Sequence, residues 1–217
     1  MVDVITSNNR YKYAPLLDQM HRDRKTVFVD RLKWDIPVVD GQFEIDQFDT
    51  DAAVYLLGLG PQGEVTSGVR LMPTTGPHLM RDVFSHTVTL GQVPCDPRVY
   101  EITRYFVWGE MRGDERRKAV TEVFCGLFEY AVARNLTQIS VVCDTFFLPR
   151  LIEAGWKVHH LGLPTEYAEG VCAAILLEVS PQRLADVRAR AGLGTRTLTF
   201  SSFPPPNADR DDDAVAA

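Results

Sequence analysis

The stretch AAVYLLGL-GPQG-EVTSGVRL, residues 52–71, decides the fold. Apolar and β-branched residues fill most of 52–59 and 64–71, and Gly60-Pro61-Gln62-Gly63 between them is a run of turn-forming residues. Two such runs joined by a short turn that contains glycine are typical of a β-hairpin. The pattern therefore predicts two consecutive antiparallel strands.

Outward from the hairpin, hydrophobic periodicity predicts further helices and strands on both sides. Ser7-Asn8-Asn9 can cap a helix that runs to about Val29, and a long irregular loop follows over residues 31–51. A strand at Val99–Trp108 precedes a long amphipathic helix at Glu115–Arg134. The other predicted elements are a short segment at Leu79–Phe84, a helix at Phe147–Ala154, a helix at Pro181–Arg190, and strands at Gln138–Cys143, Trp156–Leu161, Val171–Val179 and Thr197–Phe200.

This order of elements predicts an α/β fold in one domain, residues 1–203. Its sheet is expected to be mixed and mostly antiparallel, with helices on its faces. Residues 204–217 combine prolines with an acidic cluster, and we expect this tail to be disordered.

Composition and charge exclude several classes of protein. The 217 residues are 45% hydrophobic and 24% charged, with a formal net charge of −6, which argues against a nucleic-acid binder with a basic face. The four cysteines lie far apart without metal-ligand spacing, so we expect reduced thiols and no metal site. The sequence shows neither a leader pattern nor a long apolar run, which favours a cytoplasmic protein that does not span a membrane.

The segment from Arg24 to Asp49 gathers a cation, two large aromatic rings and two carboxylates. Arg24 and Phe28 share one helix face, Trp34 follows the helix, and Asp46 and Asp49 close the loop. A pocket for a polar, positively charged ligand with a ring needs such side chains. The alternative is an amphipathic helix followed by a surface loop whose acids are solvated.

The strand at 99–108 contains a second candidate site. Strict alternation puts Glu101 and Arg104 on opposite faces, so a β-bulge or a splayed strand must re-aim one of them if both serve one pocket. Glu101 has apolar and aromatic neighbours, and a buried carboxylate has a raised pKa and can accept a proton from an amine. The alternative is a structural ion pair of Glu101 with Arg70 or Arg104.

Basic residues cluster where the second long helix begins, at Arg112, Arg116, Arg117 and Lys118. They can bind a phosphate or an acidic protein partner, or they can form a solvated face. The sequence has no Gly-x-Ser-x-Gly element, Walker loop or dinucleotide fingerprint, which argues against serine catalysis and nucleotide hydrolysis.

Nine of these residues, in order and at their spacing, resemble the signature of the acyl-homoserine lactone synthases of the LuxI type. They are Arg24, Phe28, Trp34, Asp46, Asp49, Arg70, Phe84, Glu101 and Arg104, and Gly155-Trp156 also fits. The resemblance implies a fold similar to the Gcn5-related N-acyltransferases, with a V-shaped sheet whose splayed strands admit an acyl-pantetheine. The family lacks the Q-x-x-G-x-G phosphate loop of other acetyltransferases, and so does this sequence.

The resemblance implies a reaction between S-adenosylmethionine and an acyl thioester, without a further cofactor. The methionyl amine attacks the thioester, and the methionyl carboxylate then displaces methylthioadenosine to close the lactone. In this family the catalytic residues would be Glu101, Arg24, Arg70 and Arg104. Arg24, Phe28, Trp34, Asp46, Asp49 and Arg104 would bind S-adenosylmethionine, and Phe84, Tyr105, Val142, Phe146 and Phe147 would bind the acyl group.

The acyl donor follows from finer resemblances. Members that accept 3-oxo chains carry Thr where this chain has Val142, which cannot donate a hydrogen bond, so an unsubstituted chain is favoured. The sequence around Glu44–Asp51 and Leu148–Leu151 is similar to a rhizobial-type subset, several of whose members take short branched or aromatic acyl groups from coenzyme A (CoA). We therefore expect an acyl-CoA rather than an acyl carrier protein as donor. The alternatives are an N-acyltransferase for another amine and a non-catalytic ligand sensor.

Overall fold

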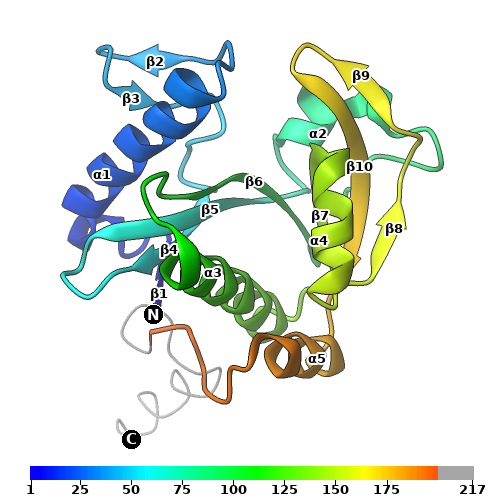
Figure 1. Ribbon diagram of the computed structural model, residues 1–217. Coiled ribbons are helices and arrows are strands. Elements are labelled where there is room, and N and C mark those ends of the chain that lie inside the picture. The colour runs from blue at the N-terminus through cyan, green and yellow to red at the C-terminus, as the bar shows by residue number, and fades with distance from the viewer. Residues whose placement is uncertain (200–217) are drawn as a thin grey trace, which may run out of the picture.

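The hairpin forms as predicted and supplies the second and third strands of the main sheet. β4 (Val54–Leu59) pairs antiparallel with β5 (Val65–Pro73), so the observed strands start one or two residues later than the sequence indicated. The computed structural model describes residues 1–199. In Figure 1 the hairpin belongs to one half of a sheet that runs across the whole molecule.

The main sheet is mixed and mostly antiparallel, as expected. Its strand order is β1 (Val2–Ile5), β4, β5, β6 (Val99–Val107), β7 (Gln138–Asp144), β10 (Gly170–Glu178) and β8 (Val158–His160), with β9 (Thr165–Tyr167) also paired to β10. Among these pairs β6 and β7 run parallel and the others run antiparallel. A separate two-stranded sheet joins β2 (Val38–Val39) and β3 (Phe43–Glu44).

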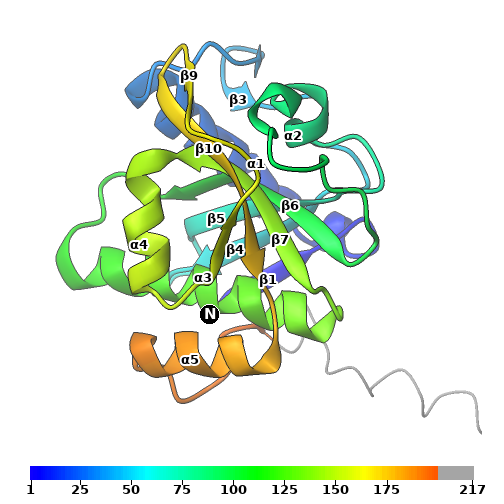
Figure 2. The same cartoon turned by 90° about the vertical axis from the view of Figure 1, so that its right-hand side faces the viewer.

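Helices cover both faces of the sheet (Figures 1 and 2). One face packs against α3 (Gly113–Ala133), α4 (Leu148–Glu153) and α5 (Pro181–Ala191) in the largest apolar core. On the other face, α1 (Ala14–Arg24) covers β4 and β5, and α2 (Leu79–Asp82) lies over β6. Within residues 1–199, no helix combines the length and the hydrophobicity needed to cross a bilayer.

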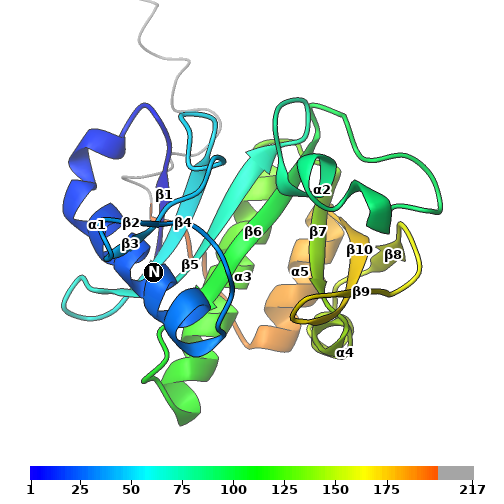
Figure 3. The same ribbon diagram turned by 90° about the horizontal axis from the view of Figure 1, so that it is seen from above.

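The sheet opens into a V between β6 and β7. These strands pair at Val99–Glu101 with Gln138–Ser140 and then diverge (Figure 3). On its other side β6 carries a bulge, because Gly68 pairs with Phe106 but Arg70 pairs with Thr103. The sequence required a β-bulge or a splayed strand, and the structure contains both.

The first helix starts later than predicted. The side chain of Asn9 accepts a hydrogen bond from the Thr6 N–H at 2.7 Å and donates to the Val4 carbonyl at 2.8 Å, so it closes a turn instead of capping a helix. A 3-10 turn at Arg10–Lys12 follows, and the α-helix begins at Ala14. After Arg24 the helix widens into a π-helical turn over Lys25–Arg31.

Several short pairings differ from the sequence-based prediction. β1 was not predicted, and the loop at 31–51 contains the small β2–β3 hairpin. β9 was also missed. The predicted strand at Thr197–Phe200 is a single bridge from Leu198 to Val2, with Phe200 outside the described residues. The tail at 204–217 likewise lies outside them.

The other predicted helices and strands are found close to their expected positions. The predicted segment at 79–84 forms α2 followed by a 3-10 turn at Ser85–Thr87, and the helix at 147–154 is preceded by a 3-10 turn at Thr145–Phe147. The strand at 138–143, the strand at 171–179 and the two longer helices after residue 110 agree with the prediction to within two residues at each end.

Candidate active site

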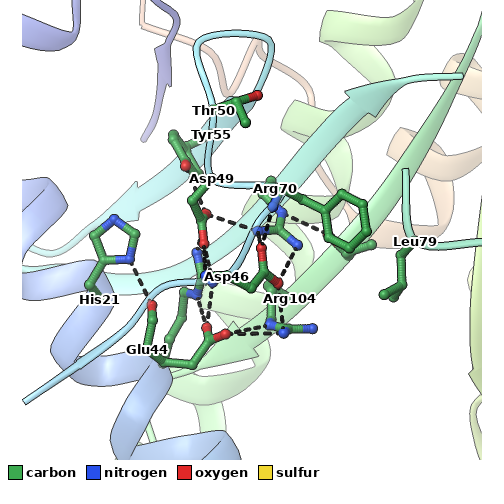
Figure 4. Close-up of polar contacts among 12 residues, drawn as sticks. His21, Glu44, Asp46, Asp49, Thr50, Tyr55, Arg70, Leu79 and Arg104 are labelled. Atoms are coloured by element: carbon green, nitrogen blue, oxygen red, sulfur yellow. Dashed lines mark hydrogen bonds and ion pairs between the residues drawn. The ribbon is translucent and has the colours of Figure 1, made fainter. Parts of the chain in front are cut away.

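Three arginines and three carboxylates interlock above the first half of the sheet (Figure 4). They are Arg24 from α1, Arg70 from β5, Arg104 from β6, Glu44 from β3, and Asp46 and Asp49 from the following loop. Each of these side chains is at least nine-tenths buried. Their formal charges cancel, which is how six ionised groups can share a buried site.

Arg24 and Asp49 form the inner part of this network. The two terminal nitrogens of Arg24 donate to the two oxygens of Asp49 at 2.8 and 2.9 Å, and the Tyr55 hydroxyl adds a third donor at 2.8 Å. Burial opposes the charge on Asp49. The hydrogen bonds from Arg24 and the charges of Arg24 and Arg70 outweigh burial and hold the pKa of Asp49 well below its usual range.

Glu44 was missed by sequence reasoning although it completes the network. It contacts Arg24 Nε at 2.5 Å and Arg104 Nε at 3.0 Å, and its backbone carbonyl contacts His21 Nδ1 at 2.9 Å. In the extended segment Phe43-Glu44-Ile45-Asp46, Glu44 and Asp46 lie on the same face. That alternation was a signal from which Glu44 could have been found.

Arg70 and Arg104 meet on Asp46. Arg70 donates to both Asp46 oxygens at 2.6 and 3.0 Å, and its Nε donates to the Thr103 hydroxyl at 3.0 Å. Arg104 donates to Asp46 at 2.8 Å. Its backbone φ of 53° lies in the left-handed region, at the bulge of β6. The bulge thus turns the Arg104 side chain toward the face that carries Asp46.

The aromatic pair lies beside this network. Trp34 N–H donates to the Phe28 carbonyl at 2.9 Å, which folds the chain back after the π-helical turn. The two rings stack with centroids 4.9 Å apart and planes 19° from parallel. The Arg104 guanidinium lies 5.8 Å from the centre of the Phe28 ring. Phe28, Trp34 and Arg104 therefore lie next to one another, beside the carboxylates of the network.

Glu101 is fully buried, and its two oxygens each accept a backbone hydrogen bond, from the N–H groups of Leu79 and Met80, both at 2.7 Å. Burial raises the pKa of Glu101 to about 7, although both amides and the charge of Arg70 act in the opposite direction. The hydrogen-bond partners of Glu101 are therefore backbone amides of α2, and not Arg70 or Arg104 as in the alternative of a structural ion pair.

A cavity of about 940 Å³ runs through the opening between β6 and β7. Phe28, Trp34, Asp46 and Arg104 line one end, and all five candidate acyl-binding residues line the same cavity: Phe84, Tyr105, Val142, Phe146 and Phe147. Arg24, Asp49, Arg70 and Glu101 lie behind its wall. These four can act on a ligand through the residues in front of them or through a bridging molecule.

Aromatic rings narrow the far end of the cavity. Tyr105 packs against Phe124 and Phe147 with centroids 4.7 and 6.4 Å away, and Phe146 packs against Phe147 at 4.6 Å. Phe124 was not predicted as a cavity residue, because helical periodicity assigned it to the apolar core.

A polar pair that the sequence did not reveal also lines the cavity. The Tyr167 hydroxyl donates to Asp144 at 2.6 Å, from β9 to the end of β7. Its position depends on the pairing of β9 with β10, and β9 is too short to be seen in the sequence.

The basic cluster divides between the cavity and the surface. Arg112 and Arg116 line the cavity, and Arg31 and Arg150 join them from the π-helical turn and from α4. Arg117 instead forms a surface ion pair with Asp114. All four basic residues of the cluster are exposed, and Arg112 and Arg116 also face the cavity.

Comparison with known proteins identifies the family. A model described as autoinducer synthase matches residues 8–187. The chain belongs to this family. As a member it is an acyltransferase of quorum sensing, an acyl-homoserine lactone synthase. Family membership therefore favours the synthase over both alternatives from the sequence, the transferase for another amine and the non-catalytic sensor.

Its relatives include CoA-dependent enzymes. The isovaleryl-homoserine lactone synthase of Bradyrhizobium diazoefficiens is 32% identical over 194 residues, which cover 89% of this chain and 86% of that protein. The structure of the CoA-dependent synthase BjaI with SAM and isopentyl-CoA is 31% identical, with a TM-score of 0.84 and 92% of each chain covered. The CoA-dependent synthase MesI is 33% identical, also with a TM-score of 0.84, over 92% of this chain and 99% of that one.

The fold itself is shared more widely. A putative N-acetyltransferase from Lactobacillus plantarum is 17% identical with a TM-score of 0.52, over 82% of this chain and 99% of that one. This likeness concerns the fold alone, and it agrees with the predicted similarity to Gcn5-related N-acyltransferases.

Proposed function

We propose that this synthase acylates the amine of S-adenosylmethionine from a short-chain acyl-CoA and then closes the lactone with release of methylthioadenosine. The observation that carries the proposal is one continuous cavity whose lining joins the charged, aromatic residues at one end to the aromatic rings around Tyr105 and Phe147. The likeness to BjaI, whose structure holds SAM and isopentyl-CoA, supports CoA as the carrier.

The charged end suits S-adenosylmethionine. The stacked rings of Phe28 and Trp34 offer a π-face to the sulfonium and the adenine. Asp46 and Arg104 line the cavity with opposite charges, which suit the ammonium and the carboxylate of the methionyl group. Arg70 pairs with the Asp46 carboxylate, and Asp49 accepts the Asp46 N–H. Arg24 pairs with Asp49 and with Glu44, and Glu44 in turn binds Arg104. The role of Arg24, Asp49 and Arg70 is therefore to position Asp46 and Arg104 through this network.

The acyl transfer needs a neutral amine, because an ammonium has no lone pair for attack on the thioester. Glu101 is the candidate base, and its pKa of about 7 lets it exist as a carboxylate at neutral pH. Each of its oxygens has a second lone pair beyond the one used by Leu79 or Met80. Because Glu101 lies behind the cavity wall, the proton reaches it through a water molecule.

The two bond changes then follow in order. The amine nitrogen bonds to the thioester carbon, the oxyanion forms, and CoA leaves as the thiol. Arg104 and Tyr105 fall outside the paired register of β6, so the backbone of the bulge is placed to donate to the oxyanion. In the second step the methionyl carboxylate oxygen bonds to the carbon next to sulfur, and methylthioadenosine leaves.

The acyl end favours a short chain. Tyr105, Phe124 and Phe147 surround it with rings, and Val142 offers no hydrogen-bond donor to a 3-oxo group. A branched group such as isovaleryl, the acyl group in the name of the B. diazoefficiens relative, suits this space. We place the reaction in the cytoplasm.

The donor is tested by presenting one isovaleryl group on CoA and on acyl carrier protein to the same enzyme preparation. We expect kcat/KM to be at least tenfold higher with CoA. Faster turnover with the carrier protein would overturn the choice of donor and leave the synthase assignment intact.

The base is tested with Glu101→Gln. We expect a loss of kcat of roughly 10²–10⁴-fold, the usual contribution of a general base. Both Glu101 oxygens accept N–H groups, so the glutamine amide must face one donor and costs about 1–3 kcal/mol of stability. A folded variant with wild-type turnover would exclude Glu101 as the base.

A further inference from the structure

The short helix α2 connects the cavity to Glu101. The Leu79 side chain lines the cavity, while its N–H and that of Met80 are bound to the Glu101 carboxylate. Four residues are too few for a helix to be stable alone, so contacts outside α2 must fix its first turn. The residue that precedes these two amides is His78.

The His78 ring is buried and fixed on one side. It has no exposed surface, and its Nδ1 lies 2.9 Å from the Gly76 carbonyl oxygen. A carbonyl oxygen can only accept, so Nδ1 carries the proton and donates. Among the described residues the other ring nitrogen, Nε2, has no hydrogen-bond partner. The Nδ1–H bond is therefore the polar contact that fixes the ring.

This bond closes the loop directly ahead of α2. The loop leaves β5 at Pro73 and is tied down at Thr74, whose hydroxyl donates toward the carbonyls of Asp96 and Val99 at 3.0 and 2.8 Å. Between Thr74 and α2, the Gly76 N–H donates to the Pro73 carbonyl at 3.3 Å, and the His78 ring donates to the Gly76 carbonyl. Without the bond from the His78 ring, α2 keeps its own backbone hydrogen bonds and the buried Met80 side chain, but the ring no longer ties the residue ahead of the two amides to the loop.

We propose that His78 is a positioning residue for Glu101, holding the Leu79 and Met80 amides on the carboxylate and thereby setting its basicity. The inference rests on the proposed role of Glu101 as the base. His78 does not touch the substrate, and it acts through the two amides.

The expected consequence has a defined sign. The groups that act on Glu101 are the two amides and Arg70 from β5, which favour the carboxylate, and Asp82 from α2, which opposes it. When the amides loosen, the carboxylate loses donors and the pKa of Glu101 rises further. The fraction of enzyme in the base form at pH 7 then falls.

The experiment compares the pH profiles of kcat/KM for three variants. His78→Leu keeps a similar side-chain volume without the hydrogen-bond donor. We expect the acid limb of its profile, the part where kcat/KM rises with pH, to shift to higher pH by roughly one unit, with turnover recovering at high pH. His78→Asn keeps a donor at the place of Nδ1, so its limb should stay at the wild-type position. The ionisation of the substrate amine contributes the same limb to every variant and so drops out of the comparison.

Ser140→Ala is the matched control. Ser140 is fully buried on β7, in register with Glu101, and its hydroxyl has no partner within residues 1–199. Its removal disturbs the same region without touching the amides, and the limb should not move. Carbon-13 NMR titration of the Glu101 carboxyl gives the same readout when turnover is low.

Two results overturn the inference. One is a folded His78→Leu protein whose acid limb and Glu101 titration match the wild type. The other is an upward shift in His78→Asn as large as that in His78→Leu. If Glu101→Gln abolishes turnover while either result is obtained, the role of His78 falls and that of Glu101 stands. If Glu101→Gln keeps full turnover, the proposed base itself falls.

Discussion

Asp49→Asn is the substitution that most directly probes the buried charge network. The change keeps the shape of the side chain and removes one negative charge. Asp49 accepts two hydrogen bonds from Arg24 and one from Tyr55, and Arg70 Nη1 lies 2.9 Å from it. It also accepts the Asp46 N–H at 2.9 Å. Asparagine must turn an NH₂ group toward some of these donors, and three arginines then face two carboxylates.

The magnitude follows from the burial of the pair. Removing one partner of a buried ion pair costs about 3–5 kcal/mol. For a domain of this size that corresponds to a fall in Tm of roughly 6–20 °C. The pKa of Asp49 is lowered in the folded state, so its stabilisation is complete above the unfolded pKa of about 4 and is lost as pH falls below it. The difference between wild type and variant should be constant from pH 6 to 8 and shrink in acid.

The assay is denaturant unfolding with calorimetry across pH, together with titration of S-adenosylmethionine. Asp51→Asn is the matched control, because Asp51 is exposed and pairs with Arg10 at the surface at 3.2 Å. That variant should lose less than about 1 kcal/mol. An Asp49→Asn protein that is as stable as the Asp51→Asn protein, and that binds S-adenosylmethionine normally, would refute the role given to the network.

Three further outcomes are expected from the cavity and from Glu101. Trp34→Ala removes the ring that stacks on Phe28, and steady-state kinetics should show KM for S-adenosylmethionine rising roughly twofold to thirtyfold; an unchanged KM would contradict a contact with the sulfonium. Val142→Thr adds a hydrogen-bond donor, so in a competition assay kcat/KM for a 3-oxo-acyl thioester, relative to the unsubstituted thioester, should rise roughly threefold to tenfold. No gain would mean that carbon 3 of the acyl chain does not lie beside residue 142. In wild-type enzyme, kcat/KM should rise with pH up to about 7 as Glu101 loses its proton, and a profile flat from pH 5 to 7 would argue against that base.

Regular periodicity made much of the fold predictable. The hairpin at 52–71 and the strand at 99–108 alternate clearly, and α3 shows its apolar face over more than five turns. The bulge at Arg104 was predictable for a different reason. Alternation placed it opposite Glu101, and only an irregular strand can make both side chains serve one pocket.

The missed elements depend on distant partners. β1 has four residues and pairs with β4, about fifty residues further along the chain, and β9 has three residues that pair with β10. Such short runs have too few residues to show a period. The predicted start of the first helix was wrong because the Asn9 side chain hydrogen-bonds to the backbone of Val4 and Thr6 instead of capping the helix. These contacts could not be predicted without knowing that β1 forms.

The site was predictable as a set of residue types and not as a layout. The sequence predicted that Arg24, Asp49 and Arg70 belong to the pocket, whereas in the structure they lie behind the residues that line it. That arrangement follows from three arginines matched to three carboxylates, and it needs Glu44, which the sequence reading left out. Charge balance inside a buried network is a property of the assembled structure, because its members come from separate elements.

The central claim is tested most directly by the products of one reaction mixture. Purified protein is incubated with S-adenosylmethionine and a panel of short-chain acyl-CoA thioesters, and the products are quantified by mass spectrometry. We predict that free CoA, methylthioadenosine and acyl-homoserine lactone appear in equal amounts, with a short acyl group giving the highest rate. Release of CoA without methylthioadenosine or lactone would contradict the account and would indicate transfer to another amine.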